Sequence, residues 1–142
     1  MSEQFELTLR NQDSEIARLH DRLEAFGTEH RMTARAVHEV QLALEEHLTN
    51  LLKHGYKDES EHQIHIRVSL NPGEMRVEVE DDGTPFDPLK HPTPDLSTPM
   101  AERPIGGLGI HMIRKSVDGL DYRRFEGKNV LVMIKTISPG LL

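Results

Sequence analysis

The chain has 142 residues, of which 36% are hydrophobic and 29% charged, and its formal net charge is -7 at pH 7. This size and balance predict one globular domain, and the absence of an apolar run of about 18 residues predicts that no helix spans a membrane. The negative charge argues against nucleic-acid binding, and the lack of cysteine excludes thiol chemistry and fits a cytoplasmic location.

The spacing of apolar residues predicts a strand followed by two helices. Residues 4–10 alternate apolar and polar side chains, which is typical of a strand with one buried face. Residues 14–27 and about 33–54 carry apolar side chains at steps of three and four, as amphipathic helices do. Gly27 is expected to end the first helix and Gly55 the second.

Two hairpins, a long loop and a third helix are expected in the rest of the chain. An antiparallel hairpin is predicted for residues 62–70 and 75–79, which alternate on either side of an Asn-Pro-Gly turn. Residues 83–105 hold six of the eight prolines and are expected to form a long loop, a kind of segment that often serves as a lid. The elements expected next are a helix over 110–118 and strands over 120–126 and 129–137. This order predicts an α+β two-layer sandwich, a mostly antiparallel sheet of about five strands covered on one face by three helices.

A pair of polar residues on the second predicted helix is the first candidate for chemistry. Glu46 and Asn50 are four residues apart and therefore lie on one helix face. A carboxylate there can act as a general base, and a carboxamide oxygen can bind Mg²⁺. A solvated helix face explains such a pair equally simply, so the neighbouring motifs must decide.

Two glycine motifs follow in the sequence. Asp81 ends an alternating strand, where its carboxylate could accept a hydrogen bond from the amine of adenine, while Gly83 allows close backbone approach; a plain Asp-Gly turn is the alternative. The Gly-Gly-Leu-Gly of residues 106–109 opens a predicted helix, whose free N–H groups can hold a phosphate. Neither glycine motif has the Rossmann or P-loop spacing. The nine histidines form no metal motif and are expected to be structural or solvated.

In this order the motifs resemble the GHKL ATPase family and its Bergerat ATP-binding fold. The pattern consists of Glu46-x-x-x-Asn50, then Asp81-x-Gly83 with Pro-Phe-Asp, then the glycine motif at 106–109. Within that family, the His-Gly-Tyr after Asn50 and the stretch GGLGIHMIRKSVD are similar to the RsbW/SpoIIAB-type anti-sigma-factor serine kinases. The resemblance spans nearly the whole chain and implies a single kinase domain over residues 1–142, with an ATP lid at about 83–105.

The resemblance implies roles for individual residues. Glu46 would be the catalytic base, Asn50 the Mg²⁺ ligand and Asp81 the adenine partner. Arg103 could reach the terminal phosphate as a bidentate donor. Asn129 replaces a hydroxyl residue common in the last strand and could still reach an adenine-bound water, while Pro85 replaces the second glycine of the first box. The backbone contacts to nucleotide would come from Gly83, Gly106, Gly107, Leu108 and Gly109.

The implied activity is the transfer of phosphate from ATP, with Mg²⁺, to a serine of a STAS-domain anti-sigma factor antagonist. The unphosphorylated antagonist and a sigma factor would compete for the kinase. Arg18 on the first helix is expected to face these partners, although an ordinary exposed arginine explains it equally well, and a homodimer is expected from the family and from the uncapped first strand. One alternative is a non-catalytic, nucleotide-gated module that sequesters a sigma factor or other regulator. The other, the catalytic half of a histidine kinase, would need a dimerisation helix pair for which 142 residues leave no room.

Overall fold

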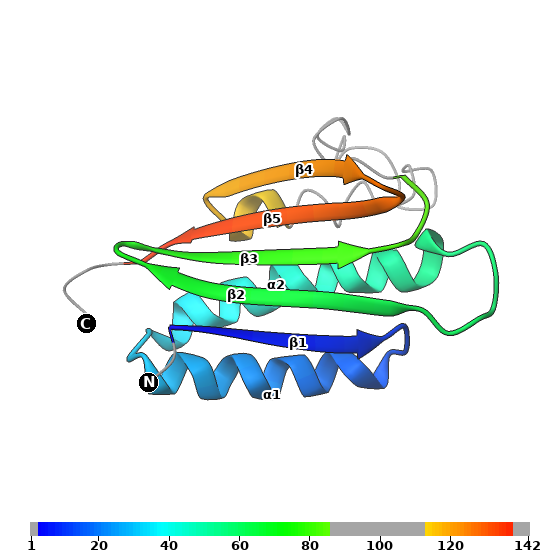
Figure 1. Ribbon diagram of the computed structural model, residues 1–142. Coiled ribbons are helices and arrows are strands. Elements are labelled where there is room, and N and C mark those ends of the chain that lie inside the picture. The colour runs from blue at the N-terminus through cyan, green and yellow to red at the C-terminus, as the bar shows by residue number, and fades with distance from the viewer. Residues whose placement is uncertain (1–2, 86–112, 138–142) are drawn as a thin grey trace, which may run out of the picture.

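The computed structural model describes residues 3–85 and 113–137. The described elements are β1 (Gln4–Arg10), α1 (Ser14–Glu29), α2 (Ala34–Asn50), the π-helical turn η1 (Leu51–Gly55), β2 (Gln63–Asn71), β3 (Glu74–Asp81), β4 (Gly119–Phe125) and β5 (Lys128–Thr136). The strands form one antiparallel sheet in the order β1-β2-β3-β5-β4. The helices α1 and α2 and the helical turn at 113–116 lie on the same side of this sheet (Figure 1).

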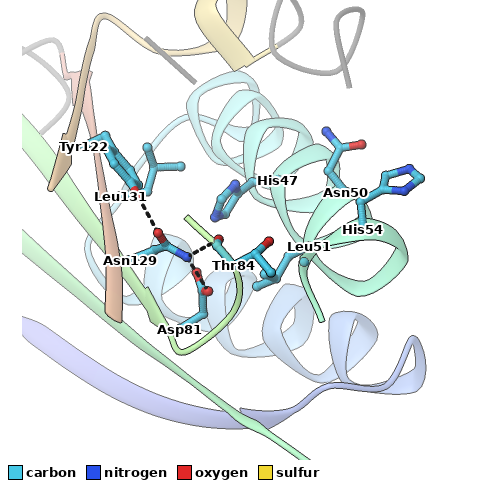
Figure 2. A pocket seen from close by; sticks show the side chains of 10 residues that line it. His47, Asn50, Leu51, His54, Asp81, Thr84, Tyr122, Asn129 and Leu131 are labelled. Atoms are coloured by element: carbon cyan, nitrogen blue, oxygen red, sulfur yellow. Dashed lines mark hydrogen bonds between the residues drawn. The ribbon is translucent and has the colours of Figure 1, made fainter. Parts of the chain in front are cut away.

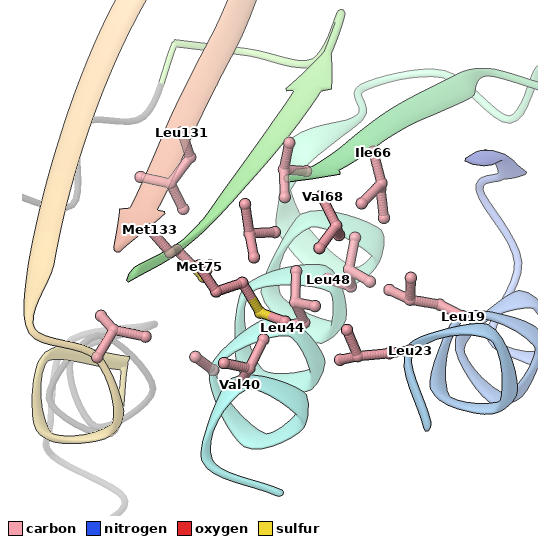
Figure 3. Close-up of a cluster of buried hydrophobic side chains, with 14 of the residues drawn as sticks. Leu19, Leu23, Val40, Leu44, Leu48, Ile66, Val68, Met75, Leu131 and Met133 are labelled. Atoms are coloured by element: carbon pink, nitrogen blue, oxygen red, sulfur yellow. The ribbon is translucent and has the colours of Figure 1, made fainter. Parts of the chain in front are cut away.

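The core lies between the sheet and the helices, because the inward positions of the strands and one face of each helix are apolar. Ile66 and Val68 of β2 alternate with exposed residues and lie in one buried cluster with Leu44 and Leu48 of α2 (Figure 3). Burial of each such side chain contributes about 1.5–3 kcal/mol relative to its exposure. This packing fixes α2 beneath the central strands and so places its polar face relative to the end of β3.

The first helix continues past the glycine that was expected to end it. Gly27 lies inside α1, and a Cβ added there would be 2.5 Å from Cγ2 of Val37, so this glycine permits close approach of α1 and α2. The helix ends instead at a Schellman motif, in which the N–H of Met32 donates to the Gly27 carbonyl at 2.8 Å. Arg31, with a φ of 56°, takes the left-handed position that glycine usually holds. The prediction that Gly27 ends the helix is wrong.

The second helix begins at the predicted residue and ends in a wider turn than expected. The hydroxyl of Thr33 caps α2 by accepting a hydrogen bond from the N–H of Ala36 at 3.1 Å. Gly55 ends the helical stretch as predicted, but its last turn, η1, is π-helical. The carbonyl of Gly55 accepts a hydrogen bond from the N–H of Thr84 at 2.7 Å. The end of the helix is thereby tied to the loop that follows β3.

Both predicted hairpins are present. Asn71 and Glu74 pair across a Pro-Gly turn in which Gly73 has a φ of 80°, as the third residue of a type II turn requires. Glu126 and Gly127 connect β4 and β5, and both have positive φ values, 49° and 79°. The predicted fold class, a two-layer α+β sandwich with five strands and helices on one face, is confirmed.

Parts of two predicted segments lie outside the described residues. The long loop predicted at 83–105 is described only at residues 83–85, and the helix predicted at 110–118 is described from residue 113, where it is helical to residue 116. Among the described helices, none combines the length and the apolar composition needed to cross a membrane.

Candidate functional site

A pocket lies between the C-terminal end of the second helix and the adjacent ends of β3 and β5 (Figure 2). At this end of the sheet some inward positions hold polar side chains, and the face of α2 that borders the pocket carries both polar and apolar side chains. The described residues that line it are His47, Asn50, Leu51, His54, Gly55, Asp81, Thr84, Tyr122, Asn129 and Leu131. The pocket thus brings together three of the residues singled out from the sequence, Asn50, Asp81 and Asn129.

Asp81 places a carboxylate where the alternation of β3 would otherwise bury an apolar side chain. It is the last of the residues of β3, beginning with Met75, whose side chains point toward the helices, and it is only 3% exposed. Its Oδ1 accepts hydrogen bonds from the N–H of Gly83 at 2.8 Å and from Nδ2 of Asn129 at 2.9 Å. Burial raises the pKa of Asp81, and these two donors oppose the rise. Both hydrogen bonds from described residues go to Oδ1, which leaves Oδ2 for a ligand.

Asn129 connects three strands at the floor of the pocket. It pairs with Asp81 in the register of β3 and β5, and its Nδ2 also donates to the carbonyl of Thr84 at 2.9 Å. Its Oδ1 accepts a hydrogen bond from the hydroxyl of Tyr122 on β4. The reversed amide would set its oxygen against the Asp81 carboxylate, so the network itself selects this orientation. Asn129 therefore fixes both the Asp81 side chain and the loop behind it.

Gly83 is required where the loop after β3 passes the end of η1. A Cβ at this position would lie 2.7 Å from the carbonyl oxygen of Gly55, which is a backbone atom. The carbonyl of Gly83 in turn accepts a hydrogen bond from Nη1 of Arg124 at 2.8 Å. The predicted reason for this glycine, close approach of the backbone to the base of a nucleotide, stays a prediction, whereas the approach that the structure shows is to η1.

Glu46 and Asn50 occupy successive turns of α2 and are both half-buried. Asn50 lines the pocket, whereas Glu46 is absent from its lining among the described residues. Arg18 lies on α1 away from the pocket, where its Nη1 donates to both carboxylate oxygens of Glu15 and to the carbonyl of Thr8. The roles assigned to these residues stay predictions. Arg103, Gly106, Gly107, Leu108 and Gly109 lie outside the described residues.

His47 and Tyr122 are two of the lining residues that the sequence did not single out as site residues. His47 is three residues before Asn50 on the same helix, and that spacing was an available signal. His47 is only 8% exposed, and burial lowers its pKa to about 4, so the imidazole is neutral at pH 7. Tyr122 gave no local signal, because only the pairing of β4 with β5 brings it to Asn129.

A second polar cluster supports the residue that follows Asp81. The imidazole of His62 bridges two carboxylates, with Nε2 2.7 Å from Asp58 Oδ1 and Nδ1 3.0 Å from Asp82 Oδ1, and it stacks on the ring of Tyr56. The pKa of His62 is raised, most by its hydrogen bond to Asp58 and next by its hydrogen bond to Asp82. The same hydrogen bond with His62 lowers the pKa of Asp58 to about 2. The bridge holds the segment after η1 against the end of β3.

The sequence matches the family described as the histidine kinase-like ATPase domain over residues 9–135. The chain belongs to this family. The resemblance to GHKL ATPases that the motifs indicated is confirmed, and the pocket lies within the part of the chain that matches the histidine kinase-like ATPase family.

Relatives of this histidine kinase-like ATPase domain are named as kinases and as an anti-sigma factor. The serine/threonine-protein kinase BtrW of Bordetella bronchiseptica is 26% identical over 117 residues, which cover 82% of each chain. The serine-protein kinase RsbW of Listeria monocytogenes is 30% identical over 107 residues, covering 72% of this chain and 68% of the relative. The anti-sigma F factor of Clostridium botulinum is 25% identical over 131 residues, covering 92% of this chain and 90% of the relative. These relatives confirm the predicted likeness to RsbW-type kinases.

A solved structure has the same fold. The crystal structure of the RsbU and RsbW domains of Rv1364c from Mycobacterium tuberculosis superposes with a TM-score of 0.68 and 17% identity. The match covers 94% of this chain and 32% of that longer chain. At this identity the likeness shows the fold of the histidine kinase-like ATPase domain and nothing about its partners.

Proposed function

We propose that this chain is an ATP-dependent serine/threonine protein kinase that also acts as an anti-sigma factor. The observation that carries the proposal is one pocket lined by the buried Asp81 carboxylate and by the carboxamide of Asn50. A hydrogen-bond acceptor for a base and an oxygen ligand for a cation thus face the same space. The names of the relatives, serine-protein kinase RsbW and anti-sigma F factor, support the same activity.

The residues of the pocket fit a magnesium nucleotide. Oδ2 of Asp81 is available to accept a hydrogen bond from the exocyclic amine of adenine, while Asn129 and Gly83 hold Oδ1. The carboxamide oxygen of Asn50 suits Mg²⁺, which takes one or two protein ligands and fills its remaining positions with water and phosphate oxygens. When bound, ATP supplies the phosphoryl group and Mg²⁺ neutralises its charge. Arg103 and the glycine motif at 106–109 remain the proposed phosphate contacts.

Glu46 is the proposed general base, because it lies one helical turn before Asn50. Its carboxylate would accept the proton of a serine hydroxyl on the substrate protein. The serine oxygen forms a bond to the γ-phosphorus while the bond from that phosphorus to the bridging oxygen breaks, giving phosphoserine and ADP. The chain's own contribution is to hold the base, the metal ligand and the adenine contact on rigid elements.

The proposed substrate is a STAS-domain anti-sigma factor antagonist, and the competing partner is a sigma factor or other regulator. Partner switching then follows from phosphorylation, because the modified antagonist no longer competes for the kinase. Arg18 is retained as a proposed partner contact, since its side chain is 52% exposed although it is paired with Glu15. We place the protein in the cytoplasm because sigma factors act there.

Phosphate transfer is tested with the purified chain, a STAS-domain antagonist, Mg²⁺ and ATP labelled on its γ-phosphate. We expect wild type to label the antagonist and Glu46→Gln to lose about 10²- to 10⁴-fold in rate, the usual contribution of a general base. Glu45→Gln is the matched control, because Glu45 is the exposed neighbour on the same helix. Failure of the wild type to transfer label rejects the kinase function.

A nucleotide-gated binding module is the second candidate, favoured by the absence of Glu46 from the pocket lining among the described residues. Such a module would bind ATP and a sigma factor without moving phosphate. Capture of the sigma factor that depends on ATP, in the same samples that show no label transfer, would establish this alternative. Capture that is independent of ATP would reject it.

We also propose that the chain forms a homodimer. In the sheet of the described residues, β1 is an edge strand that pairs on one side with β2. Side chains of α1 already bond to the end of its other edge, where Arg18 donates to the Thr8 carbonyl and Glu15 accepts from the Arg10 N–H. A second chain would pair with the part of that edge before Thr8. Light scattering of the purified protein should give the mass of two chains, and a single-chain mass at all concentrations would reject the dimer.

A further inference from the structure

A buried histidine nitrogen beside the pocket has no hydrogen-bond partner among the described residues. Nε2 of His47 is inaccessible to solvent and makes no hydrogen bond with any described residue. Figure 2 shows the ring extending from α2 toward Thr84 and Asn129. A buried polar atom without a partner destabilises a fold, and such atoms are uncommon in native proteins. The side chain that carries this atom lines the site proposed for the nucleotide.

The fold itself gives no reason for a histidine at this position. The neighbouring inward positions of α2 hold Ala43, Leu44 and Leu48, all within the apolar core, and a leucine at 47 would continue that surface. Burial instead forces the imidazole of His47 to remain neutral, as its lowered pKa of about 4 shows. The side chain therefore brings one polar edge into an otherwise apolar wall formed with Leu51 and Leu131.

We propose that, when a nucleotide binds, the His47 ring turns Nε2 toward the pocket and donates a hydrogen bond from it to a ring nitrogen of the purine. The inference rests on the proposed function, because it requires that a nucleotide binds in this pocket. A neutral imidazole protonated on Nε2 donates to a ring nitrogen, while Oδ2 of Asp81 accepts from the exocyclic amine. Adenine offers its exocyclic amine beside two acceptors, N1 and N7, whereas guanine has a carbonyl in place of the amine, which the Asp81 carboxylate would repel. His47 and Asp81 together thus select adenine.

The test uses isothermal titration of the purified full chain with ATP and with its 1-deaza, 3-deaza and 7-deaza analogues, each of which lacks one ring nitrogen. We expect wild type to bind either the 1-deaza or the 7-deaza analogue about tenfold more weakly than ATP, as the loss of one buried hydrogen bond predicts. The 3-deaza analogue should bind as ATP does, because N3 is not adjacent to the exocyclic amine. His47→Leu should bind ATP about tenfold more weakly and should no longer distinguish that analogue from ATP. The analogue that shows the effect identifies the ring nitrogen.

His20→Leu is the matched control, because His20 also has a buried Nε2 without a partner among the described residues but lies on α1, outside the pocket lining. It should bind ATP and all three analogues as wild type does. The melting temperature of each unliganded variant gives a second readout. Because leucine removes a buried unpaired nitrogen, His47→Leu should melt no lower than wild type, so its weaker binding is not a folding defect.

Three results would overturn the inference. Equal binding of ATP and all three analogues by wild type does so without any variant, even if His47→Leu fails to fold. Unchanged ATP affinity in His47→Leu, with Asp81→Asn weakened, shows that the nucleotide binds without help from His47. Wild type that binds no ATP removes the proposed function together with the inference, and this result is distinct from the first two.

Discussion

Replacing Asn129 by alanine would remove the side chain that joins β3, β4 and β5 at the floor of the pocket. Its amide donates at 2.9 Å to both the Asp81 carboxylate and the Thr84 carbonyl, and it accepts from the Tyr122 hydroxyl. A buried hydrogen bond to a charged group contributes about 1.5–3 kcal/mol and a neutral one about 1 kcal/mol. Since water can enter part of the space, we expect Asn129→Ala to lower the free energy of unfolding by about 3 kcal/mol.

The assay is urea unfolding followed by circular dichroism at neutral pH. Asn71→Ala, at the exposed end of β2, is the control and should change the free energy of unfolding by less than about 0.5 kcal/mol. ATP affinity should also fall, because loss of the amide donor further raises the pKa of Asp81 and disfavours its carboxylate. A loss of stability below about 1 kcal/mol in Asn129→Ala would refute the view that this network anchors the pocket.

Three further predictions concern stability and binding. Burial lowers the pKa of His47 to about 4 from 6.5, so below pH 6.5 the unfolded chain binds a proton on this residue that the folded chain does not. The stability that the neutral His47 contributes is therefore present above pH 6.5 and is lost as the pH falls toward 4. Urea unfolding of wild type should show a fall of about 2 kcal/mol in the free energy of unfolding between about pH 7.5 and 5, and His47→Leu should lack this fall. Gly83→Ala sets a Cβ 2.7 Å from the Gly55 carbonyl and should cost about 1–3 kcal/mol in unfolding free energy and weaken ATP binding measured by titration; an unchanged affinity would contradict this. Gly27→Ala should lower the melting temperature despite the high helix propensity of alanine, because the added Cβ meets the side chain of Val37. Adding Val37→Ala should restore part of the lost melting temperature. A higher melting temperature in Gly27→Ala alone would contradict this.

Local patterns were sufficient to predict most of the fold. Each of β2, β3 and α2 buries one face. The apolar residues of that face recur every second residue in a strand and every third or fourth in a helix, so the segment's own sequence is enough to predict the element. Gly27 was misjudged because its reason is tertiary: the Val37 side chain takes the space that a Cβ would need. The π turn at Leu51–Gly55 was likewise not predicted, and the carbonyl of its last residue bonds to a partner distant in sequence, the N–H of Thr84.

The candidate site was predictable in part. Asn50 and Asp81 were found by motif, and the structure brings them to one pocket. The contact of Asn129 with an adenine-bound water stays a prediction. Its direct hydrogen bonds to Asp81 and Thr84 were not expected, because only the pairing of β3 with β5 sets Asn129 opposite Asp81. His47 was set aside with the other histidines despite its spacing from Asn50, since its burial and the lack of a partner for Nε2 among the described residues are visible only in the structure.

The pairing of Asp81 with Asn129 has a consequence for the order in which the molecule is assembled. The two residues are 48 positions apart, so the strand that ends in Asp81 is synthesised well before its neighbour in the sheet. Until the C-terminal hairpin docks, the carboxylate has no amide partner and the pocket has no floor. A nucleotide that binds this pocket therefore stabilises, by mass action, only those molecules in which the hairpin of β4 and β5 has docked. Nucleotide binding would thus measure the fraction of molecules whose sheet is complete.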